Sequence, residues 1–164
     1  RMKRTLALLL ALLLLTGCAP TPANDNAVTF YYPRKNYVYS FMEAAIGSES
    51  RDSADMDLEY LLRLYLLGPT EENLESIYPI GTQLQSLTQA GTALTVFLSP
   101  GSNRMADISF TLAGACLAKT CFGLDDFSMV TIRSGDRDVS FRPDDLIFQD
   151  TSATLEDTQK EENP

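Results

Sequence analysis

The stretch "DLEYLLRLYLLGP", from Asp57 to Pro69, decides the fold. Its apolar residues recur three and four positions apart, which predicts a helix with a broad buried face. Asp55 or Asp57 is expected to cap this helix, because a short acidic side chain accepts hydrogen bonds from the first backbone N–H groups. Gly68 suits the left-handed position after the last turn, and Pro69 prevents continuation. The helix is therefore predicted to end near Leu67.

Short runs of β-branched and aromatic residues predict strands on both sides of this helix. Two are expected before it, at residues 28–32 and 37–41, followed by a polar loop at residues 47–54. Four are expected after it, at residues 82–88, 92–99, 127–133 and 139–141. A second helix, over residues 106–120, is apolar nearly all round and should be well buried. This order predicts an α+β fold, a small two-layer α/β sandwich in which two helices pack on one mixed sheet.

The leading stretch "LALLLALLLLTGCAP", residues 6–20, predicts a secretory signal. Its apolar core of ten residues spans only about 15 Å as a helix, roughly half the hydrocarbon thickness of a bilayer. The order Leu-Thr-Gly-Cys that ends it resembles a bacterial lipobox. This resemblance implies that residues 1–17 are removed and that Cys18 is lipidated, with residues 18–27 as a flexible tether. An ordinary signal peptide with an incidental cysteine is the alternative.

The composition argues against several classes of function. The 164 residues include no His and no Trp, and their formal net charge is −9, which becomes −12 once residues 1–17 are removed. An acidic chain repels phosphate, so no nucleic-acid partner is expected. The lack of His removes the commonest general base and metal ligand. Adjacent carboxylates such as Asp125 and Asp126 do not share a face. We therefore predict no enzyme activity, no cofactor and no metal site.

The carboxyl-terminal segment, residues 143–164, is strongly acidic. It carries seven acidic residues against one lysine, a charge of −6, which is half of the mature net charge. Such a composition is typical of a disordered tail. A contact through Leu146, Ile147 and Phe148 is the one packing interaction expected there. An interaction tail is the alternative interpretation.

Three segments, taken in order, resemble the GerMN domain of sporulation and spore-germination lipoproteins from Gram-positive bacteria. They are "YLLGPTEE" at residues 65–72, "YPIGTQL" at 78–84 leading to "TVFLSPG", and "KTCFGLDDFSMVTIRSG" at 119–135. The resemblance covers residues 28–142 and implies a fold similar to ring-building motifs, with Gly and Pro residues that serve the backbone and no catalytic site. Two positions depart from the family pattern. Phe97 stands where the family has Asp, and Cys121-Phe122 stand where it has Leu-Thr; both are interpreted as packing changes.

Cys116 and Cys121 are the two cysteines outside the lipobox. In an extracytoplasmic protein two thiols suggest a disulfide. Within one helix, however, their Cα atoms would lie about 8.5 Å apart, beyond the roughly 7 Å that a disulfide allows. A bond would require the helix to end near residues 118–120. Two buried thiols, a structural disulfide and redox chemistry remain the alternatives.

We predict a non-catalytic lipoprotein, anchored on the extracytoplasmic face of the cell membrane, that acts as an interaction or assembly module in sporulation or spore germination. Its expected partners are the membrane, through the lipid on Cys18, and either other envelope proteins or further copies of itself. Arg133, Arg137 and Arg142 form either a docking patch or scattered solubilising charge. Two other functions stay open. One is a ligand-binding lipoprotein with a groove lined by the tyrosines at 31, 32, 37 and 39, and the other is an accessory subunit of a membrane sensor.

Overall fold

The structure is a computed structural model that describes residues 27–36, 45–52 and 55–146. Several sequence predictions lie outside these residues. They are the signal segment, the lipidated Cys18, most of the tether, the strand at 37–41 and the tail from residue 147 onward. The predicted domain boundaries stay predictions for the same reason.

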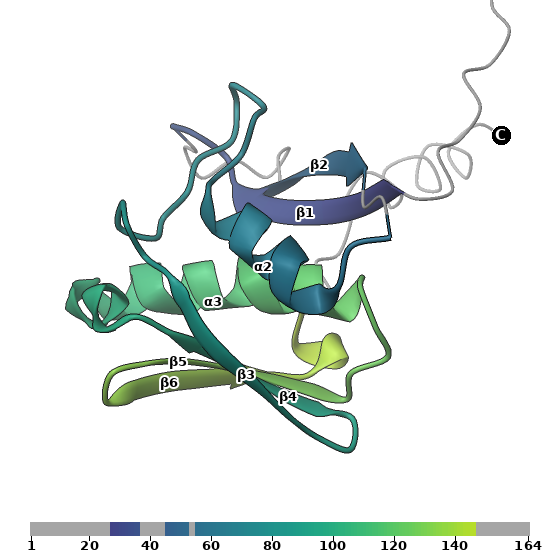
Figure 1. The fold of residues 1–164 in the computed structure, drawn as a ribbon. Helices are drawn as coiled ribbons and strands as arrows, with labels where there is room; N and C mark the ends of the chain where they lie inside the picture. Colours follow the sequence, from purple (N-terminus) through teal and green to yellow (C-terminus); the bar gives the residue numbers. More distant parts are fainter. Residues whose placement is uncertain (1–26, 37–44, 53–54, 147–164) are drawn as a thin grey trace, which may run out of the picture.

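The described chain forms six strands, two α-helices and two short 3-10 helices. In order these are β1 (Ala27–Pro33), β2 (Ile46–Asp52), α2 (Leu58–Leu66), β3 (Leu84–Ala90), β4 (Ala93–Leu98), η1 (Pro100–Arg104), α3 (Asp107–Phe122), β5 (Met129–Ser134), β6 (Arg137–Phe141) and η2 (Pro143–Leu146). The predicted α+β class is confirmed, because two helices pack on a mixed sheet (Figure 1).

The main sheet has the order β3-β4-β5-β6. Strands β4 and β5 are parallel, and the two outer pairs are antiparallel. Helix α3 makes the crossover between the parallel strands, as a parallel pair requires. The alternate residues Leu94, Val96 and Leu98 of β4 are buried against the helices, so the intervening residues face the other way.

Strands β1 and β2 form a separate antiparallel hairpin, whereas the sequence predicted one sheet that holds every strand. Figure 1 shows α3 lying between this hairpin and the main sheet, with α2 beside it. Helix α3 contacts β1 on one side and β5 and β6 on the other. Because the hairpin and the main sheet cover α3 from opposite sides, a helix that is apolar nearly all round is buried here.

The predicted polar loop at residues 47–54 is wrong over its first part, because Ile46–Asp52 forms β2. The error has a physical cause. The two inward positions of this strand are Gly47 and Glu49, neither of which gives an apolar alternation. A Cβ atom on Gly47 would lie 2.6 Å from a terminal methyl group of Leu74, so a larger residue would require the Leu74 side chain to move. Glu49 is buried with hydrogen-bonding partners described below.

Helix α2 begins and ends as the sequence predicts. The carboxylate of Asp57 accepts a 2.8 Å hydrogen bond from the backbone N–H of Tyr60 and caps the helix. Gly68 has a φ of +94°, the left-handed conformation that glycine adopts most readily. Pro69 follows and prevents another turn.

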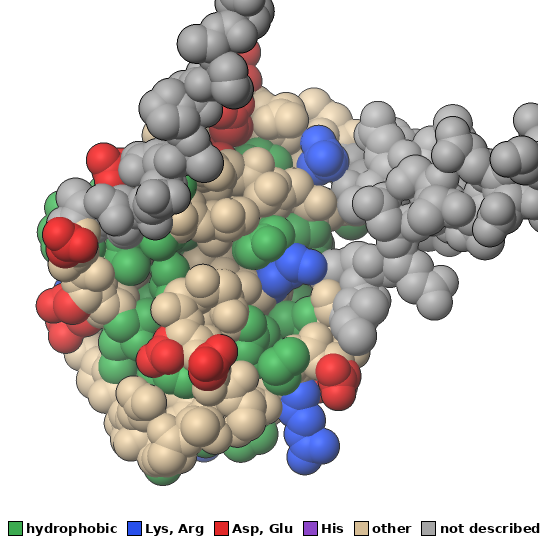
Figure 2. Space-filling view, turned by 90° about the vertical axis from the view of Figure 1, so that its right-hand side faces the viewer, with side chains coloured by type: hydrophobic (Ala, Val, Ile, Leu, Met, Phe, Trp, Pro, Cys, Tyr) green, Lys and Arg blue, Asp and Glu red, His purple; other side chains and the backbone are tan. Residues whose placement is uncertain are grey.

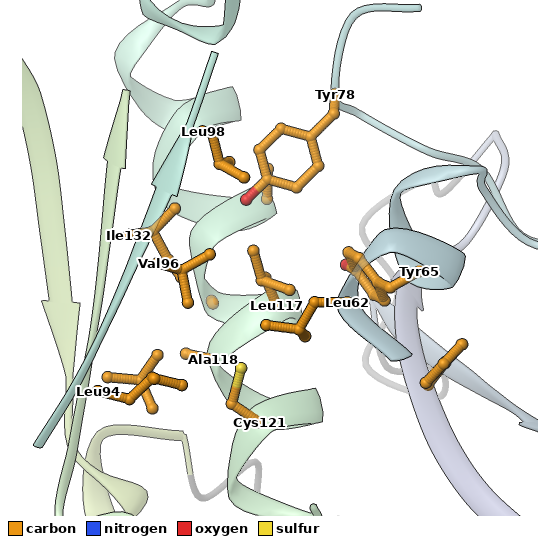
Figure 3. Packing of buried hydrophobic residues seen from close by; sticks show 14 of the residues in the cluster. Leu62, Tyr65, Tyr78, Leu94, Val96, Leu98, Leu117, Ala118, Cys121 and Ile132 are labelled. Atoms are coloured by element: carbon orange, nitrogen blue, oxygen red, sulfur yellow. The ribbon is translucent and has the colours of Figure 1, made fainter. Parts of the chain in front are cut away.

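The core lies between the main sheet and the helices (Figure 3). Val96, Leu98 and Ile132 of the sheet face Leu117 of α3, and Leu62 of α2 lies on the other side of that helix in this view. The core extends to η2, where Leu146 is 6% exposed. Residues 143–146, which the sequence predicted to be part of the acidic tail, therefore belong to the described fold.

Candidate interaction surface

The first motif, Gly68-Pro69-Thr70, is tied to the hairpin by Glu49 of β2. The Glu49 carboxylate accepts hydrogen bonds from the Thr70 backbone N–H (2.8 Å), the Thr70 hydroxyl (3.0 Å) and the Glu71 backbone N–H (3.0 Å). Arg51 donates its Nε proton to the same carboxylate at 2.7 Å and an Nη2 proton to the Gly68 carbonyl at 2.6 Å. This polar cluster joins β2 to the end of α2, so the motif serves the fold.

The protonation of Glu49 follows from these contacts. Burial by itself raises the pKa of the Glu49 carboxyl. The backbone donors of Glu71 and Thr70, with the Arg51 and Thr70 side chains, favour the charged form and outweigh that effect. The net result is a pKa below the usual value for glutamate, so Glu49 is a structural anion and not a proton donor at neutral pH.

The second motif forms a tight turn from Pro79 to Thr82. The Thr82 N–H and hydroxyl both donate to the Pro79 carbonyl, at 3.0 Å and 2.7 Å. Gly81 has a φ of +87°, which explains the glycine. The Thr82 hydroxyl also lies 3.3 Å from the Ser102 hydroxyl in η1. These residues hold the turn against η1.

Cys116 and Cys121 both lie inside α3, which continues to Phe122 without a break. Both are free cysteines with side chains shielded from solvent. Burial raises the pKa of Cys116 to about 12, although the nearby Lys119 charge acts in the opposite direction. Burial raises the pKa of Cys121 to about 12 as well. In this structure the thiols pack as small apolar groups and are held in their unreactive form.

Of the four tyrosines proposed to line a ligand groove, the structure describes Tyr31 and Tyr32, and these two do not share one surface. Tyr32 is 1% exposed, its ring stacks on Tyr65 with centroids 4.5 Å apart, and its hydroxyl donates to the Tyr65 carbonyl at 2.8 Å. The Tyr31 ring lies under the Lys119 ammonium group at 5.0 Å. Tyr37 and Tyr39 lie outside the described residues. Tyr32 therefore belongs to the core and cannot line a groove.

Arg133 and Arg137 do not share one docking patch, and Arg142 is exposed just after the end of β6. Arg133 lies on the outer face of the sheet, 3.7 Å from the Asp138 carboxylate. Arg137 lies on the helix face, where it donates to the Met105 carbonyl at 2.6 Å and to Asp107 at 2.8 Å. The two guanidinium groups are thus on opposite faces and each is paired with a carboxylate, which favours the interpretation as scattered charge.

The outer face of the main sheet is a mixed polar surface. Its register aligns one hydroxyl side chain from each strand, namely Thr88, Thr95, Thr131 and Ser140. Phe97 lies in the next row, with the Arg133 guanidinium carbon 5.8 Å from its ring centroid. The packing expected for Phe97 is therefore against Arg133 on the outer face and not in the core.

The outward side of α2 and the residue that follows it carry two of the exposed large apolar residues of the described chain; Ile80 and Ile108 are others. Tyr60 is 52% exposed and Leu67, which follows the last residue of the helix, is 82% exposed. Leu64 is half-buried and lies between them. We refer to Tyr60, Leu64 and Leu67 as the outer row. The neighbouring Glu59 and Arg63 form an ion pair at 2.6 Å, so the helix beside this row carries no net charge.

Figure 2 shows one face of the domain. Hydrophobic side chains reach this surface among acidic, basic and other polar side chains. Isolated apolar side chains of this kind are normal on a protein surface.

The described part of the chain shows no arrangement suited to metal chemistry or membrane spanning. Within residues 27–36, 45–52 and 55–146, no group of three Cys, Asp or Glu side chains is placed to hold a metal ion. None of the helices described there is long and apolar enough to cross a membrane.

Sequence reasoning missed the Glu49–Arg51 cluster and the outer row. Glu49 and Arg51 fall in the stretch interpreted as a loop, and no pattern in it indicates a buried ion pair. The outer row does leave a signal in the sequence. The apolar set of the helix at residues 58–66 is too broad for a single buried face.

Comparison with known proteins gives a structural match only. No protein-family model matches the chain, and no curated protein matches it. A Clostridium perfringens protein, provisionally assigned as a lipoprotein, matches with a TM-score of 0.46 and 15% identity over 78% of this chain and 94% of its own. The tandem GerMN domains of the sporulation protein GerM from Bacillus subtilis match with a TM-score of 0.48 and 14% identity. That match covers 74% of this chain and 43% of the tandem protein, so this chain spans less than half of it. The GerMN resemblance in the motifs thus has a counterpart among solved structures, at low sequence identity.

Proposed function

We propose that this chain is a non-catalytic lipoprotein, anchored through Cys18 on the extracytoplasmic face of the cell membrane, that acts as an assembly module related to sporulation or spore germination. The observation that carries the proposal is that some residues stabilise the fold while others remain exposed at the surface. Thr70 and Thr82 of the motif segments hold the fold through hydrogen bonds to Glu49 and to the Pro79 carbonyl, while Tyr60 and Leu67 are left at the surface. Such a division suits a domain that binds other proteins.

The proposed anchor rests on the lipobox-like order that ends at Cys18. Acyl chains on that residue would hold the protein firmly, since each buried methylene contributes about 0.8 kcal/mol. The nine peptide units from Cys18 to Ala27 reach at most about 30 Å. The domain would therefore stay close to the membrane surface, where neighbouring envelope proteins are available.

The test is metabolic labelling with radioactive palmitate in a bacterial host, followed by membrane fractionation. The full chain should incorporate label and sediment with membranes, and Cys18→Ala should lose both properties. Protease added to intact cells should digest the full chain if it lies on the outer face. An unlabelled, freely soluble full chain that behaves like Cys18→Ala would overturn the proposal.

A further inference from the structure

Helix α3 holds Cys116 and Cys121 at positions from which their thiols cannot bond to each other. Both are free cysteines inside the helix, which runs to Phe122 without a break, and both side chains are 0% exposed. A step of five residues along a helix separates the Cα atoms by about 8.5 Å and turns one side chain about 140° from the other around the axis. A disulfide needs Cα atoms within about 7 Å. The bond therefore cannot form while this part of α3 is helical.

The residues between the two cysteines are central to the fold. Leu117, Ala118 and Thr120 are all 0% exposed, and Figure 3 shows the first two in the core. The Thr120 hydroxyl donates to the Cys116 carbonyl at 3.0 Å and accepts a hydrogen bond from the backbone N–H of Tyr31, also at 3.0 Å. Thr120 thus joins this turn of α3 to β1. Unwinding the helix here would break its contacts with both the core and the hairpin.

We propose that α3 contains a redox switch: the chain folds only while Cys116 and Cys121 are thiols, and a disulfide between them keeps it unfolded. The bond requires the Cα atoms to approach each other, whereas the fold requires the helix that holds them apart. Whichever forms first therefore prevents the other. The switch does not depend on the lipid anchor proposed above.

Folding protects the two thiols from oxidation. Neither side chain is exposed, so an oxidant in solution cannot reach either sulfur without an opening of the fold. Burial also raises the pKa of each thiol to about 12, which leaves little of the thiolate that attacks a disulfide. Unfolding exposes both thiols and restores their ordinary pKa of 9.0. Oxidation is therefore confined to chains in which α3 has not formed or has opened.

The oxidant required is a small disulfide compound such as glutathione disulfide. In the unfolded chain one cysteine thiolate attacks a sulfur of this compound, releases one glutathione and leaves a mixed disulfide. The second thiolate attacks the protein sulfur of the mixed disulfide, closes the bond between residues 116 and 121, and releases the second glutathione. The two protons of the protein thiols end on the two glutathione thiols, so one disulfide is reduced as another forms. Only four residues separate the cysteines, which makes the closure local.

Refolding of the oxidised chain tests the switch. The protein is the full chain with Cys18→Ser, which has no thiols besides Cys116 and Cys121. It is unfolded in guanidinium, treated with glutathione disulfide and freed of the reagent. Mass spectrometry selects chains that have lost two hydrogen atoms and carry no glutathione. These chains are diluted into native buffer with and without a phosphine reductant, and folding is followed by circular dichroism and urea unfolding.

The reduced sample should recover its helix signal and a cooperative urea transition. Without the reductant, the folded fraction should be at least about 10-fold lower, and adding the reductant later should restore it. An oxidised sample that refolds with the same helix signal and the same urea midpoint as the reduced sample would overturn the proposal.

A variant with Cys116→Ala and Cys121→Ala is the matched control, because it meets the same oxidant but cannot form the bond. It should refold equally well with and without the oxidation step. A loss of refolding in this control as large as in the parent would place the cause outside the two thiols and overturn the proposal. The reversal by the reductant provides a second comparison within the parent chain itself.

The rate of oxidation in native buffer tests the protection that folding gives. Glutathione disulfide should close the bond at least about 100-fold more slowly in the folded chain than in the unfolded chain. Equal rates in the two states would show that the bond and the helix coexist, and would contradict the switch. All of these measurements use a chain without the anchor, so their failure would leave the proposed lipidation of Cys18 untouched, and palmitate labelling would test that separately.

Discussion

Glu49 joins the hairpin to the end of α2 through a single buried carboxylate. It receives three hydrogen bonds from Thr70 and Glu71 and pairs with Arg51, and its side chain is 2% exposed. Removing one partner of a buried ion pair is strongly destabilising, because the other charge stays in the protein without compensation. The fold is therefore sensitive to the loss of either partner.

The first prediction follows from this cluster. Glu49→Gln keeps the shape but removes the charge, and should lower the free energy of unfolding by about 2–4 kcal/mol. Glu59→Gln is the matched control, because the Glu59–Arg63 pair is half-exposed and should cost less than about 0.5 kcal/mol. Urea unfolding of both variants makes the comparison. Equal losses in the two variants would contradict the role given to Glu49.

Glu49 also makes the free energy of unfolding depend on pH in the acid range. The pKa of Glu49 is lower in the folded state than in the unfolded chain, so its contribution is present above the unfolded value of 4.5. That contribution is lost as the pH falls below 4.5 and through the folded pKa. Glu49→Gln should therefore show a flatter loss of stability over this acid range than the unmodified chain.

Tyr78 presents the opposite case, a buried hydroxyl without a hydrogen-bond partner among the described residues. Its ring enters the core beside Leu98 (Figure 3). Tyr78→Phe should leave the free energy of unfolding unchanged or raise it by up to about 1 kcal/mol, because an unsatisfied buried group is costly. Tyr65→Phe is the control. It removes the 3.0 Å hydrogen bond from the Tyr65 hydroxyl to the Tyr31 carbonyl and should cost about 1 kcal/mol. A larger loss in Tyr78→Phe than in Tyr65→Phe, measured by urea unfolding, would contradict this account.

At the scale of elements, α3 determines the state of the two interior cysteines. The helix runs through both positions, and burial raises both pKa values to about 12. In the full chain with Cys18→Ser, both thiols should react with a maleimide at least about 100-fold more slowly than the thiol introduced by Ile108→Cys. After unfolding in guanidinium without reductant, two thiols per chain should react rapidly. No reaction after unfolding would show a disulfide and contradict the structure.

The raised thiol pKa values also predict the alkaline behaviour. A folded pKa above the unfolded value of 9.0 means that the neutral thiols contribute stability below pH 9. This contribution is lost as the pH rises from 9 toward 12. The loss in unfolding free energy over this range should be smaller when both cysteines are replaced by alanine.

The elements were predictable from sequence where local chemistry alone specified them. Asp57, Gly68 and Pro69 fixed the bounds of α2, and alternation in Leu94, Val96 and Leu98 predicted β4. Strand β2 was not predictable, because its two inward residues give no apolar alternation. Gly47 leaves room for the Leu74 side chain, and Glu49 is buried with hydrogen-bond donors about 20 residues away in the sequence. Pairing of β1 and β2 as a separate hairpin depends on contacts with α3 that no local pattern shows.

The candidate surface was predictable only in part. The apolar set of the helix at residues 58–66 predicted one broad buried face, but which apolar residues at its edges stay exposed depends on how α2 packs. The arginines at 133 and 137 are near in sequence but separated to opposite faces by the alternation of paired strands. The role of Phe97 likewise depends on which side of β4 the helices cover.

At the scale of the whole molecule, the proposed anchor and its short tether would hold the domain near the membrane. The domain carries exposed apolar residues on the outward side of α2. A hairpin, a helical layer and a four-stranded sheet enclose one core. Tyr60 and Leu67 stay accessible at the surface of this acidic chain. Membrane confinement would raise the effective concentration of the chain for its proposed partners.

The most direct test of this central claim is crosslinking in intact cells, with an amine-reactive reagent and immunodetection of the full chain. We predict species heavier than the monomer, formed with further copies or with other envelope proteins, in the membrane fraction. These species should be lost in Cys18→Ala, which releases the chain from the membrane. A membrane-bound chain that remains entirely monomeric after crosslinking would contradict the assembly function.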